Sequence, residues 1–456
     1  MEVQKEGTEN KMGVMPVNRL LLSMSVPMII SMLVQALYNV VDSVFVSKIS
    51  EDALTAVSIA FPMQNLMIAV SSGIGVGMNA LLSRSLGERN FDRANRTAGQ
   101  GIFLNAVGCG IFILLGIFAM DFFVSTQTGV DTIREPSAAY LKICCICSFG
   151  LFTQVTFERL LQSTGRTFYA MITQGTGAVL NIILDPILIF GLFGMPKLGV
   201  AGAAAATVIG QCAAGTLAVF FNFKKNPDLQ FGRHYLRPQK QISLRVLAIG
   251  VPSILMMSIG SVMTFAMNQI LFAFSTTAVA VFGAYFKLQS FFFMPIFGLN
   301  NGMVPVVAFN LGAGKRDRMH KTIKYSMFYA VGIMLIGFAV FQLAPDLLLK
   351  AFDASEDMLA IGVPALRTIS LSFLVAGFCV ISGSACQALG KSMYSLWISL
   401  GRQLLALVPI AWLLSKTGNL EAVWLAFPLA EIVSLILSIL FLRKALKGIP
   451  WGTEAK

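Results

Sequence analysis

Charged residues are scarce in this sequence of 456 residues. Asp, Glu, Lys and Arg make up 12% of the chain, whereas soluble domains carry about 25%. Histidine occurs only at His234 and His320, in basic loops, so the apolar stretches contain no histidine for a metal site or for acid–base catalysis. We therefore predict no enzymatic activity, no cofactor and no metal site apart from a sodium site described below. A chain that is 56% apolar needs a lipid bilayer to cover its surface.

The seven cysteines all lie in apolar stretches, where disulfides are not expected. Cys144, Cys145 and Cys147 lie close together in the sequence, but no histidine accompanies them, so we interpret this cluster as packing. The leading nineteen residues are polar, and no cleavage pattern precedes the first apolar run. We expect no cleavable signal peptide.

Apolar stretches long enough to cross about 30 Å of hydrocarbon as helices recur along the whole chain. We predict twelve, at residues 20–46, 53–82, 98–120, 137–157, 168–191, 199–222, 246–273, 277–309, 322–343, 359–384, 392–415 and 420–442.

The net charge of +12 follows the predicted loops. Of the 34 Lys and Arg residues, 25 fall in the tails and in or beside the loops after even-numbered spans, with clusters at 84–96, 224–245 and 315–324. The opposite loops contain only Lys48, Arg134, Lys197, Lys350 and Lys416. Cationic loops face the cytoplasm, so we predict that both termini are cytoplasmic and that nucleic acid is not a partner.

The sequence repeats itself with a shift of 225 residues. Identical residues recur without a gap: Pro27, Phe61, Gln64, Gly73, Gly77, Met78, Leu86, Gly87, Asp92 and Arg93 return as Pro252, Phe286, Gln289, Gly298, Gly302, Met303, Leu311, Gly312, Asp317 and Arg318. Each copy contains six spans, so both copies have the same orientation. This predicts an all-α membrane protein of two six-helix lobes, related by a pseudo-two-fold axis along the membrane normal.

The polar segment between the copies contains Pro227, Gly232 and Pro238. We predict an amino-terminal lobe at 1–222, a cytoplasmic linker at 223–245 and a carboxyl-terminal lobe at 246–456. Gly73 and Gly77 are four residues apart and predict a seam of close helix packing, whereas Gly87 predicts a helix end.

The first span contains an acid, Asp42, in an apolar run. Gln35, Tyr38 and Asn39 precede it at helical spacing, so the four side chains share one face, which should contact protein or water. The second copy has Met267 in place of Asp42. Carboxylate chemistry is therefore expected in one lobe only.

The fifth span contains a second acid, Asp185, four residues after Asn181. Pro186 follows and cannot donate to the carbonyl of Ile182, so a carboxylate, an amide and a free carbonyl converge. Thr207 in the sixth span adds a hydroxyl. Hard oxygen ligands of this kind suit a proton or a sodium ion.

An alternative is that each acid is fixed by a basic partner for bundle specificity alone. No Lys or Arg lies inside the first, second, third, fifth or sixth predicted span, and Lys142 lies near a span end. Burial among apolar helices favours the neutral form of a carboxyl group, which allows proton exchange. In the second lobe, Arg402 and Glu431 predict a structural ion pair in adjacent spans.

Methionine is abundant, with 23 residues. Flexible thioethers suit a pocket for varied ligands, but ordinary membrane packing explains them equally well. Lys287 lines the predicted cleft or shields an acid, and the sequence does not decide between these roles. The candidate substrate-contacting or supporting residues are Gln35, Tyr38, Asn39, Met63, Met67, Met256, Met263 and Lys287.

The motifs YNVVDSVFV, GIGVGMNALLSRSLGERNFDRA, LNIILDPILIFG and GAAAATVIG, in this order, resemble the multidrug and toxic compound extrusion transporters. Within that family the chain is most similar to the bacterial branch related to DNA-damage-inducible and staphylococcal multidrug exporters. The resemblance implies a cation site at Asp42, Asn181, Asp185 and Thr207, in a bacterial inner membrane. Acids of the kind found in the seventh and tenth spans of another branch are absent from 246–273 and 359–384.

The predicted function is therefore export of amphiphilic, often cationic, organic molecules in exchange for protons or sodium, by rocking of the two lobes. We expect a monomer working in membrane lipid. A flippase for lipid-linked oligosaccharides is the alternative, but it needs a cationic cavity, whereas the spans of the first lobe are acidic.

Overall fold

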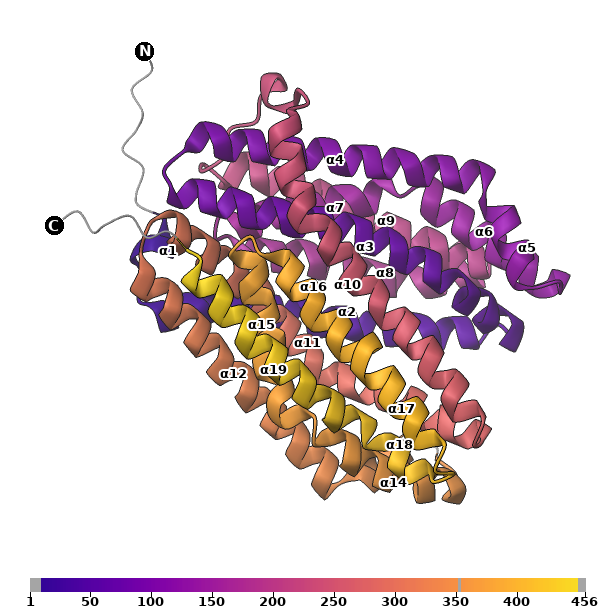
Figure 1. Cartoon of the computed structure of the whole chain (residues 1–456). Helices are drawn as coiled ribbons and strands as arrows, with labels where there is room; N and C mark the ends of the chain where they lie inside the picture. The colour runs from indigo at the N-terminus through magenta and orange to yellow at the C-terminus, as the bar shows by residue number, and fades with distance from the viewer. Residues whose placement is uncertain (1–9, 352–353, 450–456) are drawn as a thin grey trace, which may run out of the picture. The chain divides into compact units, whose positions relative to one another are not determined.

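The computed structural model describes residues 10–351 and 354–449, and every regular element in these ranges is a helix (Figure 1). Within them, ten helices are long and apolar enough to cross a membrane, and two bent pairs of shorter helices raise the number to as many as twelve. Each of the twelve predicted spans overlaps one or more of these helices, and the all-α prediction is confirmed.

The chain packs into two compact units. Unit 1 comprises the described residues up to Val251 together with Asn301–Thr322, and unit 2 comprises Pro252–Asn300 and the described residues from Ile323 onward. The boundaries after Val251, Asn300 and Thr322 all lie inside long helices, so continuous helices connect the units. The predicted lobe limits at 222 and 246 stay a prediction.

Unit 1 contains the helices of the first sequence copy. They are α1 (Lys11–Val14), α2 (Val17–Ser47), α3 (Glu51–Gly87), α4 (Phe91–Phe118), α5 (Met120–Gln127), α6 (Asp131–Ile146), α7 (Phe149–Ser163), α8 (Thr167–Phe190), η1 (Leu192–Gly194), α9 (Val200–Lys225) and η2 (Arg233–Leu236).

The second copy supplies the remaining helices. They are α10 (Lys240–Phe272), α11 (Thr276–Gly312), α12 (Arg316–Leu343), α13 (Pro345–Lys350), α14 (Glu356–Ser370), α15 (Phe373–Ala388), α16 (Ser392–Leu400), the π-helix η3 (Gly401–Leu407), α17 (Val408–Ser415), α18 (Leu420–Trp424) and α19 (Ala426–Lys447). Aromatic rings fill the core of unit 2, where Phe341 and Phe373 lie 5.2 Å apart between centroids.

The fourth span of each copy is broken at the same place. The chain bends by 46° between α6 and α7 and by 52° between α14 and α15. The helices that begin these pairs start at Asp131 and Glu356, which are 225 residues apart. Duplication has therefore preserved a bend that the sequence analysis did not predict, because each break lies inside a continuous apolar run.

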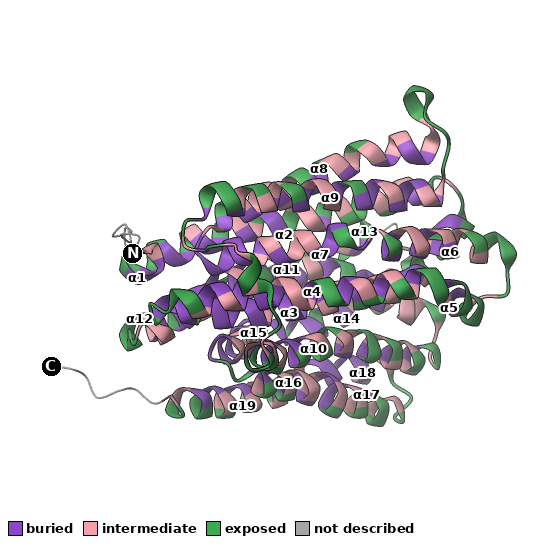
Figure 2. Ribbon diagram, turned by 90° about the horizontal axis from the view of Figure 1, so that it is seen from above, coloured by how far each residue is buried: buried purple, intermediate pink, exposed green. Residues whose placement is uncertain are grey.

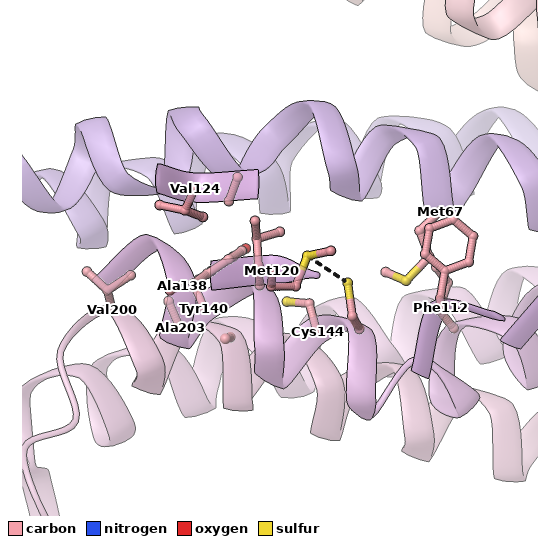
Figure 3. Close-up of a cluster of buried hydrophobic side chains, with 14 of the residues drawn as sticks. Met67, Phe112, Met120, Val124, Ala138, Tyr140, Cys144, Val200 and Ala203 are labelled. Carbon is pink, nitrogen blue, oxygen red and sulfur yellow. Dashed lines mark hydrogen bonds between the residues drawn. The ribbon is translucent and has the colours of Figure 1, made fainter. Parts of the chain in front are cut away.

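Buried apolar side chains of α3, α4, α5 and α6, among others, form a core cluster in unit 1. Met67 packs beside Phe112, and Met120 accepts a weak hydrogen bond from the Cys145 thiol at 3.9 Å (Figure 3). Cys144 and Cys145 are buried in this cluster, as the packing interpretation predicted. Exposed residues gather at turns such as the η1 loop between α8 and α9 (Figure 2).

Glycines permit the two copies to cross within unit 1. A Cβ atom on Gly77 would lie 2.1 Å from the carbonyl oxygen of Val246, which confirms close packing at this seam. At the ends of α3 and α11, a Cβ on Gly87 would meet the Phe309 oxygen at 2.0 Å, and one on Gly312 would meet the Arg84 oxygen at 2.1 Å. These two contacts are equivalent under the 225-residue repeat. α3 also ends at Gly87, as predicted.

The end of unit 1 that carries the basic clusters at 84–96, 224–245 and 315–322, here called the basic end, also holds α1. The carbonyl oxygen of Met15 accepts a hydrogen bond from Arg318 at 2.7 Å, and that of Gly13 accepts one from Lys315 at 2.8 Å. The linker is held beside α4, because Gln100 donates to the Arg237 carbonyl at 2.7 Å and accepts from the Gln239 amide at 2.9 Å.

Candidate functional site

The site lies where α2, α8 and α9 pack together in unit 1. Asn181 and Asp185 share one face of α8, and their exposed fractions are 3% and 0%. Pro186 lies inside α8 rather than at its end, so the carbonyl of Ile182 lacks its helical donor. The helix stops five residues later at Gly191, whose φ of 74° suits a residue without a side chain.

Asp42 of α2 and Asp185 of α8 lie close enough for their carboxyl groups to interact. Two ionised carboxylates side by side would repel each other and could only accept hydrogen bonds, so a proton or a cation between them is favoured. One oxygen of each acid is buried without any partner. Neither acid forms an ion pair with a described residue, so the alternative of an acid fixed by Lys or Arg does not apply here.

Asn181 connects Asp185 to Thr207. In one orientation its amide nitrogen donates to the Thr207 hydroxyl at 3.3 Å. In the flipped orientation the nitrogen donates to Asp185 Oδ2 at 3.1 Å and the amide oxygen accepts from the Thr207 backbone N–H at 3.1 Å. The flipped orientation serves an ionised Asp185, since it directs an N–H at the carboxylate. The four residues expected to hold the coupling ion therefore lie together.

The flanking residues of α2 separate into two groups. Tyr38 interacts electrostatically with both acids, and Gln35 accepts a hydrogen bond from Gln174 of α8 at 2.9 Å. Asn39 is exposed, and its carbonyl accepts from the Ser43 hydroxyl at 2.9 Å. Of the predicted polar stripe, Tyr38 interacts with the acids and Gln35 contacts α8, whereas Asn39 is exposed.

A second polar layer beside Asp42 was missed from the sequence. Gln64 of α3 donates to the Tyr140 hydroxyl at 3.0 Å and to the Cys144 sulfur at 3.7 Å. Tyr140 also interacts electrostatically with Asp42 and Tyr38. The recurrence of Gln64 as Gln289 was the available signal, but a repeated residue alone does not distinguish a scaffold role from a site role.

The candidate methionines have different surroundings. Met67 is 3% exposed in the core cluster of unit 1, and Met63 packs against the same cluster. These surroundings agree with ordinary packing, the alternative given for the methionines. Met256, in unit 2, accepts a hydrogen bond from Ser395 at 3.3 Å. Met263 is buried and Lys287 is exposed in unit 2. A substrate-binding role for these residues stays a prediction.

Two charged pairs lie within spans. The predicted pair in unit 2 is present, with Arg402 Nη1 3.8 Å from Glu431 Oε1. Glu158 and Arg159 were missed, because the fourth span was predicted to end at residue 157, whereas α7 continues to Ser163. An acid and a base at the end of an apolar run look like the end of a span in the sequence. In the structure, polar side chains inside the bundle form hydrogen bonds with both residues.

Duplicated spans, two units and a buried carboxyl pair define a polytopic helical membrane protein with two acids inside its first set of spans. A family model described as MatE matches residues 27–187 and 252–413, two matches that begin 225 residues apart. The chain belongs to the MatE family, as the sequence motifs predicted.

Named relatives match most of the chain. The probable multidrug resistance protein YoeA of Bacillus subtilis is 29% identical over 422 residues, which cover 90% of each protein. The multidrug export protein MepA of Staphylococcus haemolyticus is 26% identical over 416 residues, covering 91% of each. A solved outward-facing multidrug resistance MATE transporter has the same fold, with a TM-score of 0.92 at 24% identity over 98% of this chain and 99% of that one.

Proposed function

We propose that this protein is a secondary antiporter that exports amphiphilic organic compounds, often cationic, in exchange for external protons or sodium ions. The observation that carries the proposal is the pair Asp42–Asp185, whose carboxyl groups lie close together in apolar surroundings. The names of relatives in the same family, the multidrug export protein MepA and the probable multidrug resistance protein YoeA, support the substrate class. Nothing in these names favours the flippase alternative.

The pair performs the exchange through its charge. Deprotonated and open to the inside, it attracts a cationic compound directly or through coupled helix movement. A proton or a sodium ion arriving from outside neutralises the pair and releases the compound. The oxygens of Asp42, Asn181, Asp185 and Thr207 are ligands that sodium accepts as readily as a carboxylate accepts a proton.

Movement between the inward and outward states occurs by rocking of one unit against the other. The unit boundaries follow Val251 in α10, Asn300 in α11 and Thr322 in α12. Pro252 leaves a carbonyl of α10 without a donor, which makes this a favourable point for bending.

We place the basic end in the cytoplasm of a bacterial cell, with both termini on that side and the helices in the inner membrane. The support is the concentration of Lys and Arg at this end. The protein acts as a monomer surrounded by lipid.

Dye extrusion from everted membrane vesicles tests the proposal. Asp42→Asn and Asp185→Asn should abolish ion-driven extrusion, because an amide cannot exchange the proton. Asp131→Asn is the matched control, since that carboxylate is 71% exposed in a surface ion pair with Arg134. Normal ion-driven extrusion by both site variants would refute the assignment.

The same vesicles identify the coupling ion. A pH gradient without sodium and a sodium gradient without a pH difference are imposed separately. Extrusion under the first alone defines a proton antiporter, and extrusion under the second alone defines a sodium antiporter.

A further inference from the structure

α7 contains a buried acid that the Asp42–Asp185 pair does not use. Glu158 is 7% exposed, and its Oε1 atom lies 3.1 Å from the Gln154 amide nitrogen and 3.0 Å from the Thr173 hydroxyl of α8. It forms no ion pair within the described part of the chain. The neighbouring Arg159 interacts with Glu158 electrostatically, but its guanidinium donates its hydrogen bonds to Gln162 and Asn301.

The hydrogen bonds to Glu158 leave its negative charge without a counter-ion. The Thr173 hydroxyl has one hydrogen, which it shares between the Ala170 carbonyl at 2.7 Å and Glu158 Oε1 at 3.0 Å. Gln154 donates to the same carboxyl oxygen. Burying an ionised carboxyl group without an ion pair costs free energy, and a bound proton removes that cost.

The position of Glu158 relates it to the main site. Thr173 and Asp185 both lie on α8, twelve residues apart and about 120° apart around the helix axis. At a rise of 1.5 Å per residue, Thr173 lies about 18 Å from Asp185 along the helix, toward the basic end. Glu158 therefore lies between the carboxyl pair and the basic end, in a bundle where α7, α8 and α9 pack against one another (Figure 1).

Arg159 connects this acid to the second copy of the repeat. Its guanidinium donates to Gln162 at 3.0 Å and to Asn301 of α11 at 2.9 Å. Its stem fits against α3, where a Cβ on Gly75 would lie 2.8 Å from the Arg159 Cγ atom. Asn301 is the first residue of the α11 segment that belongs to unit 1. A negative charge on Glu158 would compete for Arg159 at this boundary.

We propose that Glu158 is a second proton-exchange site of the antiporter, which takes up a proton from the pathway and releases it to water at the basic end. On release the O–H bond breaks, the proton leaves with water, and Arg159 neutralises the remaining carboxylate. The ligand is a proton rather than sodium, because Gln154 directs an N–H at the carboxyl and Arg159 adds a positive charge, both of which repel a metal cation. This inference rests on the proposed antiport.

The experiment measures proton stoichiometry in proteoliposomes containing the full chain, using a monovalent cationic dye at zero sodium gradient. The dye accumulation ratio at equilibrium is recorded at several imposed pH differences. Glu158→Gln keeps both hydrogen bonds, because its amide oxygen can accept from Gln154 and Thr173 as Oε1 does, but it carries no exchangeable acid. It should lower the accumulation ratio about tenfold per pH unit, the loss of one proton per cycle.

Thr173→Val is the matched control. It removes the hydrogen-bond partner but keeps the acid, so the stoichiometry should be unchanged while the pH of half-maximal rate shifts. Infrared pH-difference spectra of the purified protein provide a second readout, in which a protonated carboxyl band should be lost in Glu158→Gln.

The outcomes separate the two proposals. If Asp42→Asn and Asp185→Asn abolish coupling while Glu158→Gln matches the wild type in stoichiometry and infrared band, Glu158 is only a structural hydrogen-bonding group and the inference is overturned. If the two aspartate variants retain normal coupling, the antiport assignment fails whatever Glu158 does. If Glu158→Gln does not fold, an infrared spectrum of the wild type with no second titrating carboxyl band overturns the inference.

Discussion

At the scale of single residues, this membrane protein concentrates its chemistry in a few oxygen atoms that have incomplete partners. Asp42 and Asp185 each keep a buried oxygen without a hydrogen bond. Such an atom costs free energy in the resting protein, and a proton or an ion recovers that energy on binding. The unsatisfied oxygens are therefore the expected binding positions.

Thr207 tests the hydroxyl component of the site. Thr207→Val preserves shape but removes the oxygen that contacts Asn181, so a buried amide loses its partner at a cost of about 1–3 kcal/mol. We expect lower thermal stability and weaker ion-driven extrusion. Thr207→Ser, which keeps the hydroxyl, should behave as the wild type. Equal behaviour of the two variants would show that the hydroxyl has no role.

Lys11 gives a prediction outside the membrane. Burial, together with the nearby Arg166, lowers the pKa of the Lys11 ammonium. A lowered folded-state pKa means that the charged form destabilises the fold at neutral pH, and that this penalty disappears as the pH rises above the unfolded value. Lys11→Met should therefore raise the melting temperature near pH 7.5. The difference between the two proteins should disappear at strongly alkaline pH, and a constant difference would contradict the explanation.

At the scale of elements, much of the architecture follows from the sequence. Hydrophobic length predicts the spans, and acids within apolar runs predict Asp42 and Asp185. Three features could not be predicted. The bend between α6 and α7 lies in a continuous apolar run, Glu158 and Arg159 imitate a span end, and α1 is fixed by side chains of α11 and α12 such as Arg318 that are distant in sequence. Each depends on tertiary contacts.

The glycine crossing of α3 and α11 gives a prediction for paired elements. Gly87→Ala and Gly312→Ala each place a methyl group about 2 Å from a carbonyl oxygen of the facing helix, so each should destabilise the protein by about 1–3 kcal/mol. Gly110→Ala is the control, because nothing lies within 4 Å of its added Cβ in the middle of α4. That variant should be neutral or stabilising by about 0.5–1 kcal/mol. Thermal unfolding in detergent ranks the three; equal melting temperatures would disprove the close crossing.

At the scale of the whole molecule, duplication and asymmetry have separate roles. The repeat supplies two sets of six spans, equivalent bends and an equivalent glycine crossing. Ion chemistry follows only one copy, because Asp42 and Asp185 correspond to Met267 and Ile410. In the proposed antiport, the first copy therefore binds the ion, and continuous helices such as α10 and α11 are the expected route by which the change reaches the other unit.

The number of protons per cycle decides whether the membrane potential drives export. If the carboxyl pair and Glu158 each move one proton inward for one monovalent dye outward, one net positive charge enters per cycle. A potential of about 100 mV, negative inside, is then worth about 2.3 kcal/mol, or roughly a fiftyfold change in the dye ratio. Proteoliposomes clamped with a potassium ionophore at equal pH on both sides should show this change for the wild type. Glu158→Gln should respond to the pH gradient alone, because its exchange of one proton for one dye is electroneutral. A wild-type dye ratio that is unaffected by voltage would contradict the two-proton cycle.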